Sequence, residues 1–213
     1  MSELTFTVLD VAPERYAVAP NLTARLRIDE STGATVHALA LRCQVRIEPQ
    51  RRRYTEAEAG GLIDLFGPTE RWRSTLRAFP WLQCSVTLPG FTGTSEVELA
   101  MPCTYDFEVS ASKYLHALGE GTVPLVFLFS GTVFTRGAAG FGVEAIPWDR
   151  EADYDMPAVV WRNLMQEHFP NSGWIRLDAD TLRTLTRYKS GRGLLSLDAA
   201  VVELLQGAGE SVG

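Results

Sequence analysis

The sequence of 213 residues lacks the short motifs that would identify an enzyme at once. It contains only three histidines and three cysteines, and it has no G-x-S-x-G, no P-loop pattern and no H-E-x-x-H. Those motifs position a nucleophile, a phosphate or a zinc ion, so their absence argues against the corresponding hydrolases. No C-x-x-C or H-x(3–5)-H spacing occurs either. We therefore expect no enzyme activity, no metal site and no cofactor.

Long hydrophobic runs and an excess of positive charge are also missing. The longest apolar run, at 123–129, is far shorter than the roughly 20 residues of a membrane helix. The net charge of −6 and the isoelectric point near 5.2 oppose binding to nucleic acid or to anionic lipid. The first ten residues show no basic stretch followed by an apolar one, so we expect no signal peptide. These features predict a cytoplasmic protein without nucleic-acid or membrane partners.

Alternating apolar and polar residues mark much of the first half of the chain. Apolar residues recur at every second position in 4–8, 22–28 and 39–47, as in strands with one buried and one wet face. With 46% hydrophobic residues, the chain has ample material for a core. The cysteines lie on the inward faces of predicted strands, where we expect free thiols that pack as small apolar groups: Cys43, Cys84 and Cys103.

Two predicted strands near the middle of the chain carry the strongest β signal. Residues 103–109 alternate, whereas 123–129 are apolar at nearly every position, which is typical of a central strand covered on both faces. A short helix is expected between them. Gly131, inside the second strand, predicts a bulge or the close approach of a neighbouring backbone.

Helical periodicity interrupts the strands at 50–80. Thr69 is the expected N-cap of a helix that contains Trp72 and that Pro80 ends. Three consecutive arginines at 51–53 suggest an anion site, although the nearby glutamates favour a solvated turn.

Three amphipathic helices are predicted after residue 157, and their apolar stripes must be covered by the strands or by a partner. The chain is therefore predicted to be α+β and mainly β. We expect an antiparallel immunoglobulin-like β-sandwich in residues 1–148, with a helical insertion at 50–80. A C-terminal helical segment in 149–213 is expected to pack on this sandwich.

An acidic cluster lies between the two predicted parts. Its spacing matches the first four ligand positions of a calcium loop, but Tyr154 and Val160 stand where that loop needs glycine and glutamate. An acidic, solvated linker is the preferred interpretation. His168 shares an apolar helix face with Trp161 and Leu164, so it is more typical of a packing residue than of a catalytic base. The cluster comprises Asp149, Glu151, Asp153 and Asp155.

Aromatic residues supply the candidate partner-binding sites. Five tryptophans are many for this length, and three of them, Trp148, Trp161 and Trp174, flank the helical part. They either anchor helices to the sheet or form an interaction hot spot. Tyr188 and Arg192 lie in a glycine-ended helix terminus that forms either a backbone nest for an anion or an ordinary helix end. We take these five residues as the candidate partner-binding set.

Four sequence runs suggest a family. They are P-C-T-Y-D-F-E-V-S-A-S-K-Y-L at 102–115, F-L-F-S-G-T-V-F at 127–134, I-P-W-D at 146–149 and R-Y-K-S at 187–190. With them the chain resembles an uncharacterised, mainly actinobacterial family of about this length that is known as a domain of unknown function. Members tend to be encoded beside NiFe hydrogenase genes, so the resemblance implies a hydrogenase or its maturation proteins as partners. It implies no catalytic residue.

Three functions follow from these observations. The preferred one is a non-catalytic accessory or assembly protein that binds another protein. The second is a binder of a small ligand or peptide, with its site between the sandwich and the segment 50–80. The third is an unrecognised hydrolase or isomerase, in which the acidic cluster and His168 would have to converge in one cleft.

Overall fold

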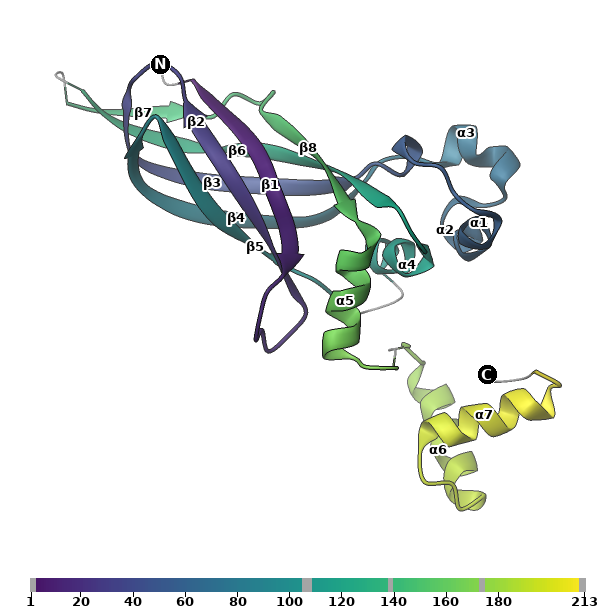
Figure 1. Ribbon diagram of the computed structural model, residues 1–213. Coiled ribbons are helices and arrows are strands. Elements are labelled where there is room, and N and C mark those ends of the chain that lie inside the picture. The colour runs from purple at the N-terminus through teal and green to yellow at the C-terminus, as the bar shows by residue number, and fades with distance from the viewer. Residues whose placement is uncertain (1–2, 105–108, 138–139, 173–174, 211–213) are drawn as a thin grey trace. The chain divides into compact units, whose positions relative to one another are not determined.

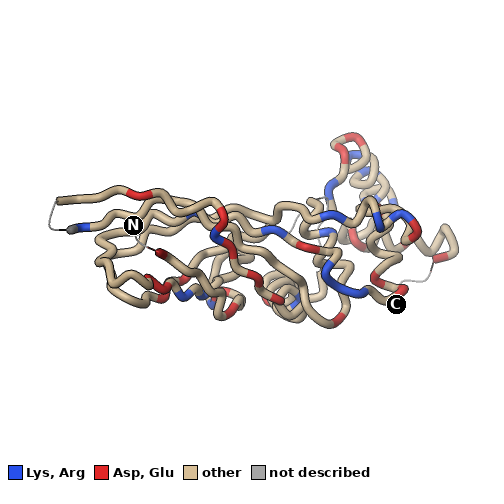
Figure 2. The backbone as a smooth tube through the Cα atoms, turned by 90° about the horizontal axis from the view of Figure 1, so that it is seen from above, with Lys and Arg blue, Asp and Glu red and all other residues tan. Residues whose placement is uncertain are grey.

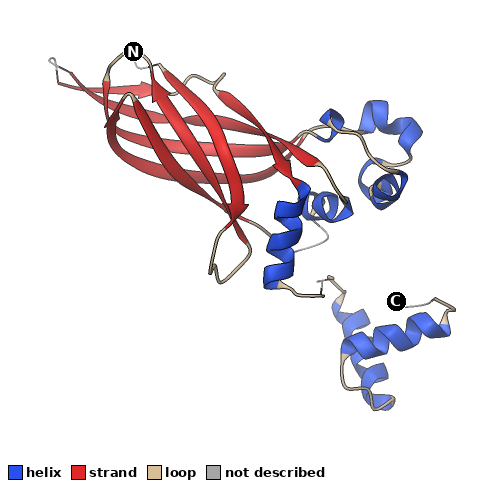
Figure 3. Ribbon diagram, in the orientation of Figure 1, coloured by secondary structure: helices blue, strands red, loops and turns tan. Residues whose placement is uncertain are grey.

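The computed structural model describes residues 3–104, 109–137, 140–172 and 175–210. The chain divides into two compact units, Met1–Trp174 and Ile175–Gly213. The first unit contains all the described strands and seven of the nine described helical segments, whereas the second unit is helical (Figures 1 and 3). No helix among the described residues is both long and apolar enough to cross a membrane.

A three-stranded antiparallel sheet opens the first unit. Its order is β1 (Leu4–Pro13), β2 (Asn21–Glu30) and β5 (Thr94–Pro102). The predicted alternation holds, because every second residue of β2 from Leu22 to Ile28 is buried. A register shift between Val8 and Asp10 of β1 marks a bulge.

A five-stranded antiparallel sheet forms the second layer. Its order is β4 (Phe79–Thr92), β3 (Thr35–Ile47), β6 (Thr122–Gly137) and β7 (Gly140–Ala145), and β8 (Glu151–Pro157) also pairs with β6. The long β6 has neighbours on both sides. It pairs with β3 along one edge, and β8 and β7 pair with the first and second halves of the other edge. This confirms it as a central strand.

The two sheets share one apolar core. The rings of Phe6 in β1 and Phe129 in β6 stack across the layers with centroids 4.3 Å apart. At one margin of the layers, the hydroxyl of Tyr154 donates to Asp10 at 3.4 Å. The fold is therefore mixed α and β with mainly antiparallel strands in two sheets, as the sequence indicates.

Gly131 lies where β6 comes closest to β3. Its φ is 143°, and a Cβ built on it would lie 2.0 Å from the carbonyl oxygen of Ala40. No side chain fits there, which confirms the predicted close backbone approach.

Short helices fill the insertion between β3 and β4. They are η1 (Pro49–Arg51), α1 (Glu56–Gly61), α2 (Ile63–Phe66), η2 (Thr69–Arg71) and α3 (Trp72–Thr75). The segment is helical as predicted, and it lies at the same end of the strands as α4 (Ser110–Ala117) and α5 (Ala158–His168) (Figure 1).

The details of this insertion differ from the prediction. The capping box is made by Thr55 and Glu58 at the start of α1. Thr69 begins a 3-10 turn instead of capping a helix, and α3 ends at Thr75. Pro80 therefore stops no helix. It lies at an edge position of β4, where its missing N–H is tolerated.

The acidic segment after residue 148 is a strand and not a linker. Glu151, Asp153 and Asp155 are exposed, and the intervening Ala152, Tyr154 and Met156 face the core to different degrees. The sequence did not reveal this strand because the polar residues of the alternation are all acidic, and an acidic run is equally typical of a solvated linker. The first compact unit consequently continues to Trp174, beyond the predicted boundary at residue 148.

The second unit is a pair of helices. They are α6 (Ala179–Gly191) and α7 (Leu197–Gly207). The hydroxyl of Ser196 accepts from the Ala199 amide at 3.0 Å and caps α7. The expected strand at 103–109 lies largely outside the described residues.

Candidate partner-binding surfaces

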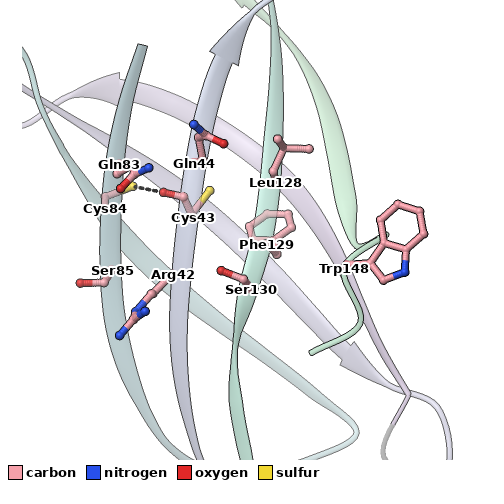
Figure 4. Close-up of a pocket in the computed structure, with 10 residues that line it drawn as sticks. All are labelled: Arg42, Cys43, Gln44, Gln83, Cys84, Ser85, Leu128, Phe129, Ser130 and Trp148. Atoms are coloured by element: carbon pink, nitrogen blue, oxygen red, sulfur yellow. Dashed lines mark hydrogen bonds between the residues drawn. The ribbon is translucent and has the colours of Figure 1, made fainter. Parts of the chain in front are cut away.

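A polar groove lies on the five-stranded sheet, and Trp148 stands beside it (Figure 4). Trp148 belongs to the connection between β7 and β8, and its side chain is 93% exposed. The groove has a volume of about 640 Å³. The other residues that line it are Arg42, Cys43, Gln44, Gln83, Cys84, Ser85, Leu128, Phe129 and Ser130.

Strand register determines the chemistry of this groove. Arg42 lies opposite Ser85 on one side and Ser130 on the other, and the next row of the same face brings Gln44 opposite Gln83. Guanidinium, amide and hydroxyl groups thus share one surface with an exposed indole. Neither a carboxylate nor an imidazole is among the described residues that line the groove. It can bind through hydrogen bonds and stacking, but it has no acid–base pair.

Two thiols lie side by side beneath this groove. Cys43 and Cys84 face each other in the β3–β4 register, and Sγ of Cys84 lies 3.7 Å from the Cys43 carbonyl oxygen, to which it donates. The interaction with Cys84, together with burial, raises the pKa of Cys43. Cys43 is buried and Cys84 is half-buried, so Cys84 is the more accessible thiol of the pair.

Trp161 is a core residue and presents no surface to a partner. It is 1% exposed, and its ring packs edge-on against Trp81 at 6.2 Å and His116 at 5.4 Å between centroids. Burial lowers the pKa of His116 to about 4, so this histidine is neutral near pH 7. Of the two interpretations of Trp161, the structure supports the anchor that fixes α5 to the strands. Trp174 lies outside the described residues.

Arg51 and Arg52 hold parts of the fold together. Arg51 pairs with Asp153 at 2.7 Å, and Arg52 pairs with Glu58 at 2.7 Å with both side chains almost fully buried. Arg52 also donates to the carbonyl oxygens of Glu120 and Thr122. These bonds tie the insertion to the start of β6, which accounts for two of the three arginines without an anion.

Glu58 is the centre of that buried network. Its carboxylate accepts from the amides of Thr55 and Gly119, both at 2.9 Å, as well as from Arg52. Burial alone would raise the pKa of Glu58, but these hydrogen bonds and the guanidinium outweigh it and lower the pKa below its usual value.

Tyr188 and Arg192 join the two helices of the second unit. The Tyr188 hydroxyl donates to Glu203 of α7 at 3.0 Å, and Arg192 pairs with the same carboxylate at 3.3 Å. The guanidinium also lies over the Tyr188 ring, 5.5 Å from its centroid. The backbone amides of residues 192–194 donate to helix carbonyls. This end of α6 is therefore an ordinary helix terminus and not an anion-binding nest.

The same helix pair leaves several leucines exposed and its other large apolar side chains only half-buried. Ala200 is the only buried residue in the described part of α6 and α7. A shallow apolar hollow of about 460 Å³ lies beside Leu185, Tyr188 and Leu204. Leu204 and Leu205 are 46% and 40% exposed. The further exposed apolar residues of this unit are Ile175, Leu182, Leu195 and Leu197.

Other candidate groups form no cluster of metal-ligand type. Among the described residues, no three His, Cys, Asp or Glu side chains are arranged to hold a metal ion. The carboxylates of Glu151, Asp153 and Asp155 project from the exposed positions of β8, and Asp153 is engaged by Arg51. His168 ends α5.

Solved structures show only distant likenesses. The chain is similar to β-glucosidase 3B from Thermotoga neapolitana at 11% identity and a TM-score of 0.28, over 72% of this chain and 17% of that one. It is similar to a β-glucosidase from Kluyveromyces marxianus at 9% identity and a TM-score of 0.25, over 73% and 15%. A putative late embryogenesis abundant protein is 11% identical with a TM-score of 0.30, over 73% and 71%.

This chain thus spans less than a fifth of either glucosidase chain, and the TM-scores are too low to establish a shared fold. No curated protein matches the chain. The match that covers it from end to end is to a family model: over residues 1–213 the chain belongs to a family of unknown function (DUF6084).

Proposed function

We propose that this protein is a non-catalytic interaction module that binds another protein through the α6–α7 hairpin. The observation that carries the proposal is the contrast between the amphipathic sequence of these helices and their burial of Ala200 alone. Helices of this length are marginal in water unless an apolar face is packed. A partner that covers Leu182, Leu204 and Leu205 would supply that packing.

The charges of the α6–α7 hairpin predict the complementary charges of the partner's surface. Arg187 and Lys189 are cations of α6, and Asp198 is an anion of α7. Glu203 is already engaged by Tyr188 and Arg192, and Arg183 by Asp180. A complementary surface is an apolar groove or helix with acidic groups toward α6 and basic groups toward α7.

Affinity purification of the full-length tagged chain from its native cells tests this function. We expect a partner that is enriched with the wild type, lost with Leu204→Glu and retained with Thr186→Glu. Thr186 is exposed on α6, so its substitution adds the same charge without changing the apolar surface. Recovery of the chain alone, or equal recovery with both variants, would contradict the proposal.

A hydrogenase subunit or a hydrogenase maturation protein is the partner class that we propose. The support is the resemblance of residues 102–115 and 127–134 to a family encoded beside such genes. A cytoplasmic location agrees with the three free cysteines, because disulfides are rare in reducing compartments. Mass spectrometry of the purified complex identifies the partner, and a complex without hydrogenase-related proteins would contradict this assignment.

The strand order supports a finer description of the fold. We propose an immunoglobulin-like sandwich, with β1-β2-β5 facing β4-β3-β6-β7 and β8 as an additional strand. An experimental structure with a different strand order would contradict it.

Ligand binding at the groove beside Trp148 is the second candidate function. Two hollows border the segment 50–80, where the ligand site was predicted: one of about 460 Å³ beside Tyr54 and Glu58, and one of about 260 Å³ beside Phe66 and Phe79. The larger groove on the sheet combines an exposed indole with Gln44 and Gln83, so it suits a small polar ligand with a flat apolar side. Quenching of Trp148 fluorescence by a ligand library, compared with Trp148→Ala, tests this alternative.

A further inference from the structure

The free edges of the two sheets differ in how they are protected against pairing with another chain. An exposed strand edge presents unpaired N–H and C=O groups, and natural proteins protect such edges with charges, bulges, prolines or short strands. On β5, Glu96 and Glu98 are exposed. On β8, Glu151, Asp153 and Asp155 are exposed. Both edges would repel an approaching acidic chain.

Two further edges are protected by geometry. β1 carries the bulge between Val8 and Asp10, and Tyr154 reaches across to Asp10. β7 has only six residues and contains Gly140, Gly142 and Glu144. Bulged or short glycine-containing strands make poor templates for pairing.

β4 lacks these protections over most of its length. It is the terminal strand of its sheet, with β3 as its hydrogen-bonded neighbour in the described part of the chain. Residues 78–95 contain no Asp, Glu, Lys or Arg, and much of the strand layer carries no charge (Figure 2). Pro80 and Pro89 lie near the ends of β4, which leaves residues 81–88 as an uninterrupted segment without proline, glycine or charge.

The side chains of this segment are also incompletely covered. Leu82, Cys84 and Val86 lie on the face toward the core and pack against its buried residues, yet each is only half-buried. Gln83 and Ser85, on the opposite face, are exposed and neutral. An added strand would continue the sheet, satisfy the free backbone groups and cover the three half-buried side chains.

We infer that β4 pairs with β4 of a second copy of this chain, antiparallel and about a two-fold axis at Cys84. Two copies with a net charge of −6 each repel one another, so they associate most easily along a segment without charge. Antiparallel pairing of a strand with itself gives a closed two-fold dimer. In this register Leu82 lies opposite Val86 of the second copy, and Gln83 opposite Ser85, so apolar meets apolar and polar meets polar.

Sedimentation of the full-length chain at rising concentration tests the dimer. We expect a mass of twice 23.5 kDa for the wild type. Ser85→Lys should raise the dissociation constant about tenfold or more, because it places the two lysines at diagonal positions on the same face of the pair. Ala100→Lys adds the same charge at an exposed position of β5 and should leave the dimer unchanged. A monomeric wild type, or a dimer that Ser85→Lys leaves intact, would overturn the inference.

A variant in the α6–α7 hairpin distinguishes the β4 interface from the proposed partner-binding site. Leu204→Glu should not change the self-association. If it dissociates the dimer while Ser85→Lys does not, the second copy docks on the helices and the β4 inference fails.

Oxidative cross-linking tests the register. With Cys43→Ala and Cys103→Ala in place, Cys84 is the remaining thiol, and a two-fold axis at this residue brings the two Cβ atoms within disulfide range. We expect a covalent dimer with these two substitutions and none when Cys84→Ser is added. Failure to cross-link under conditions where the dimer is populated would overturn the Cys84-centred register.

Discussion

The two units of this chain contain the same kind of amphipathic pattern but differ in where their apolar faces are covered. In the strand unit, alternating residues of β2 and β3 are almost fully buried in one shared core. In the helical unit, α6 and α7 bury Ala200 alone and leave leucines exposed. The first unit buries its apolar faces in its own core, and the exposed leucines of the second support the proposal that a partner supplies the surface that covers them.

The largest expected effect is the loss of the Trp161 side chain. Trp161→Ala removes a buried indole that packs against Trp81 and His116, so urea unfolding should show a loss of about 3–5 kcal/mol. Leu204→Ala in the hairpin should change the same transition by less than about 0.5 kcal/mol, as at other surface positions. Equal losses would contradict the proposed difference between the units.

Trp161→Phe sharpens this prediction. The indole N–H has no hydrogen-bond partner among the described residues, so the phenyl ring loses volume but no hydrogen bond. The destabilisation should therefore be clearly smaller than that of Trp161→Ala.

Replacement of Gly131 should have the next largest effect. A Cβ at this position would lie 2.0 Å from the Ala40 carbonyl oxygen, at a φ of 143°. Gly131→Ala should push β6 away from β3. The strain alone should lower the free energy of unfolding by about 1–3 kcal/mol, which is measured as a lower midpoint of thermal unfolding. Gly60→Ala is the control, because it lies in α1 with nothing within 4 Å of its Cβ, and should be neutral or slightly stabilising.

The buried Glu58 should make the strand unit sensitive to acid. Its folded-state pKa is lower than the ordinary value of 4.5, so the unfolded state binds more protons. The stability that it contributes is complete above the ordinary pKa and is lost as pH falls through the folded-state value. Glu58→Gln should flatten the decline in urea midpoint on acidification, although it lowers stability at neutral pH. Glu70→Gln, at an exposed position, should leave that decline unchanged.

The sequence predicted the fold where periodicity and burial agree. Strands such as β3, the central position of β6 and the close approach at Gly131 followed from alternation and from glycine's lack of a side chain. β8 was missed because its exposed positions are all acidic, and such a run is equally typical of a linker. The local sequence pattern shows which residues of a segment alternate, but it does not show whether another strand pairs with that segment.

The candidate site was less predictable. An aromatic residue indicates a buried anchor or an exposed contact equally well, and only packing separates Trp161 in the core from Trp148 on the surface. Tyr188 and Arg192 turned out to share Glu203 as a partner, a contact between helices that spacing along one helix cannot show. Whether β4 is open to pairing with another chain likewise depends on its place at the edge of the sheet, which is a property of the whole sheet.

Amide hydrogen exchange of the full-length chain tests the central comparison most directly. The amides of β3 and β6 should exchange only on global unfolding, whereas those of α6 and α7 should exchange orders of magnitude faster and gain protection when a partner binds. Protection of α6 and α7 equal to that of β3 in the isolated chain would contradict the account, because the helices would then be covered without any partner.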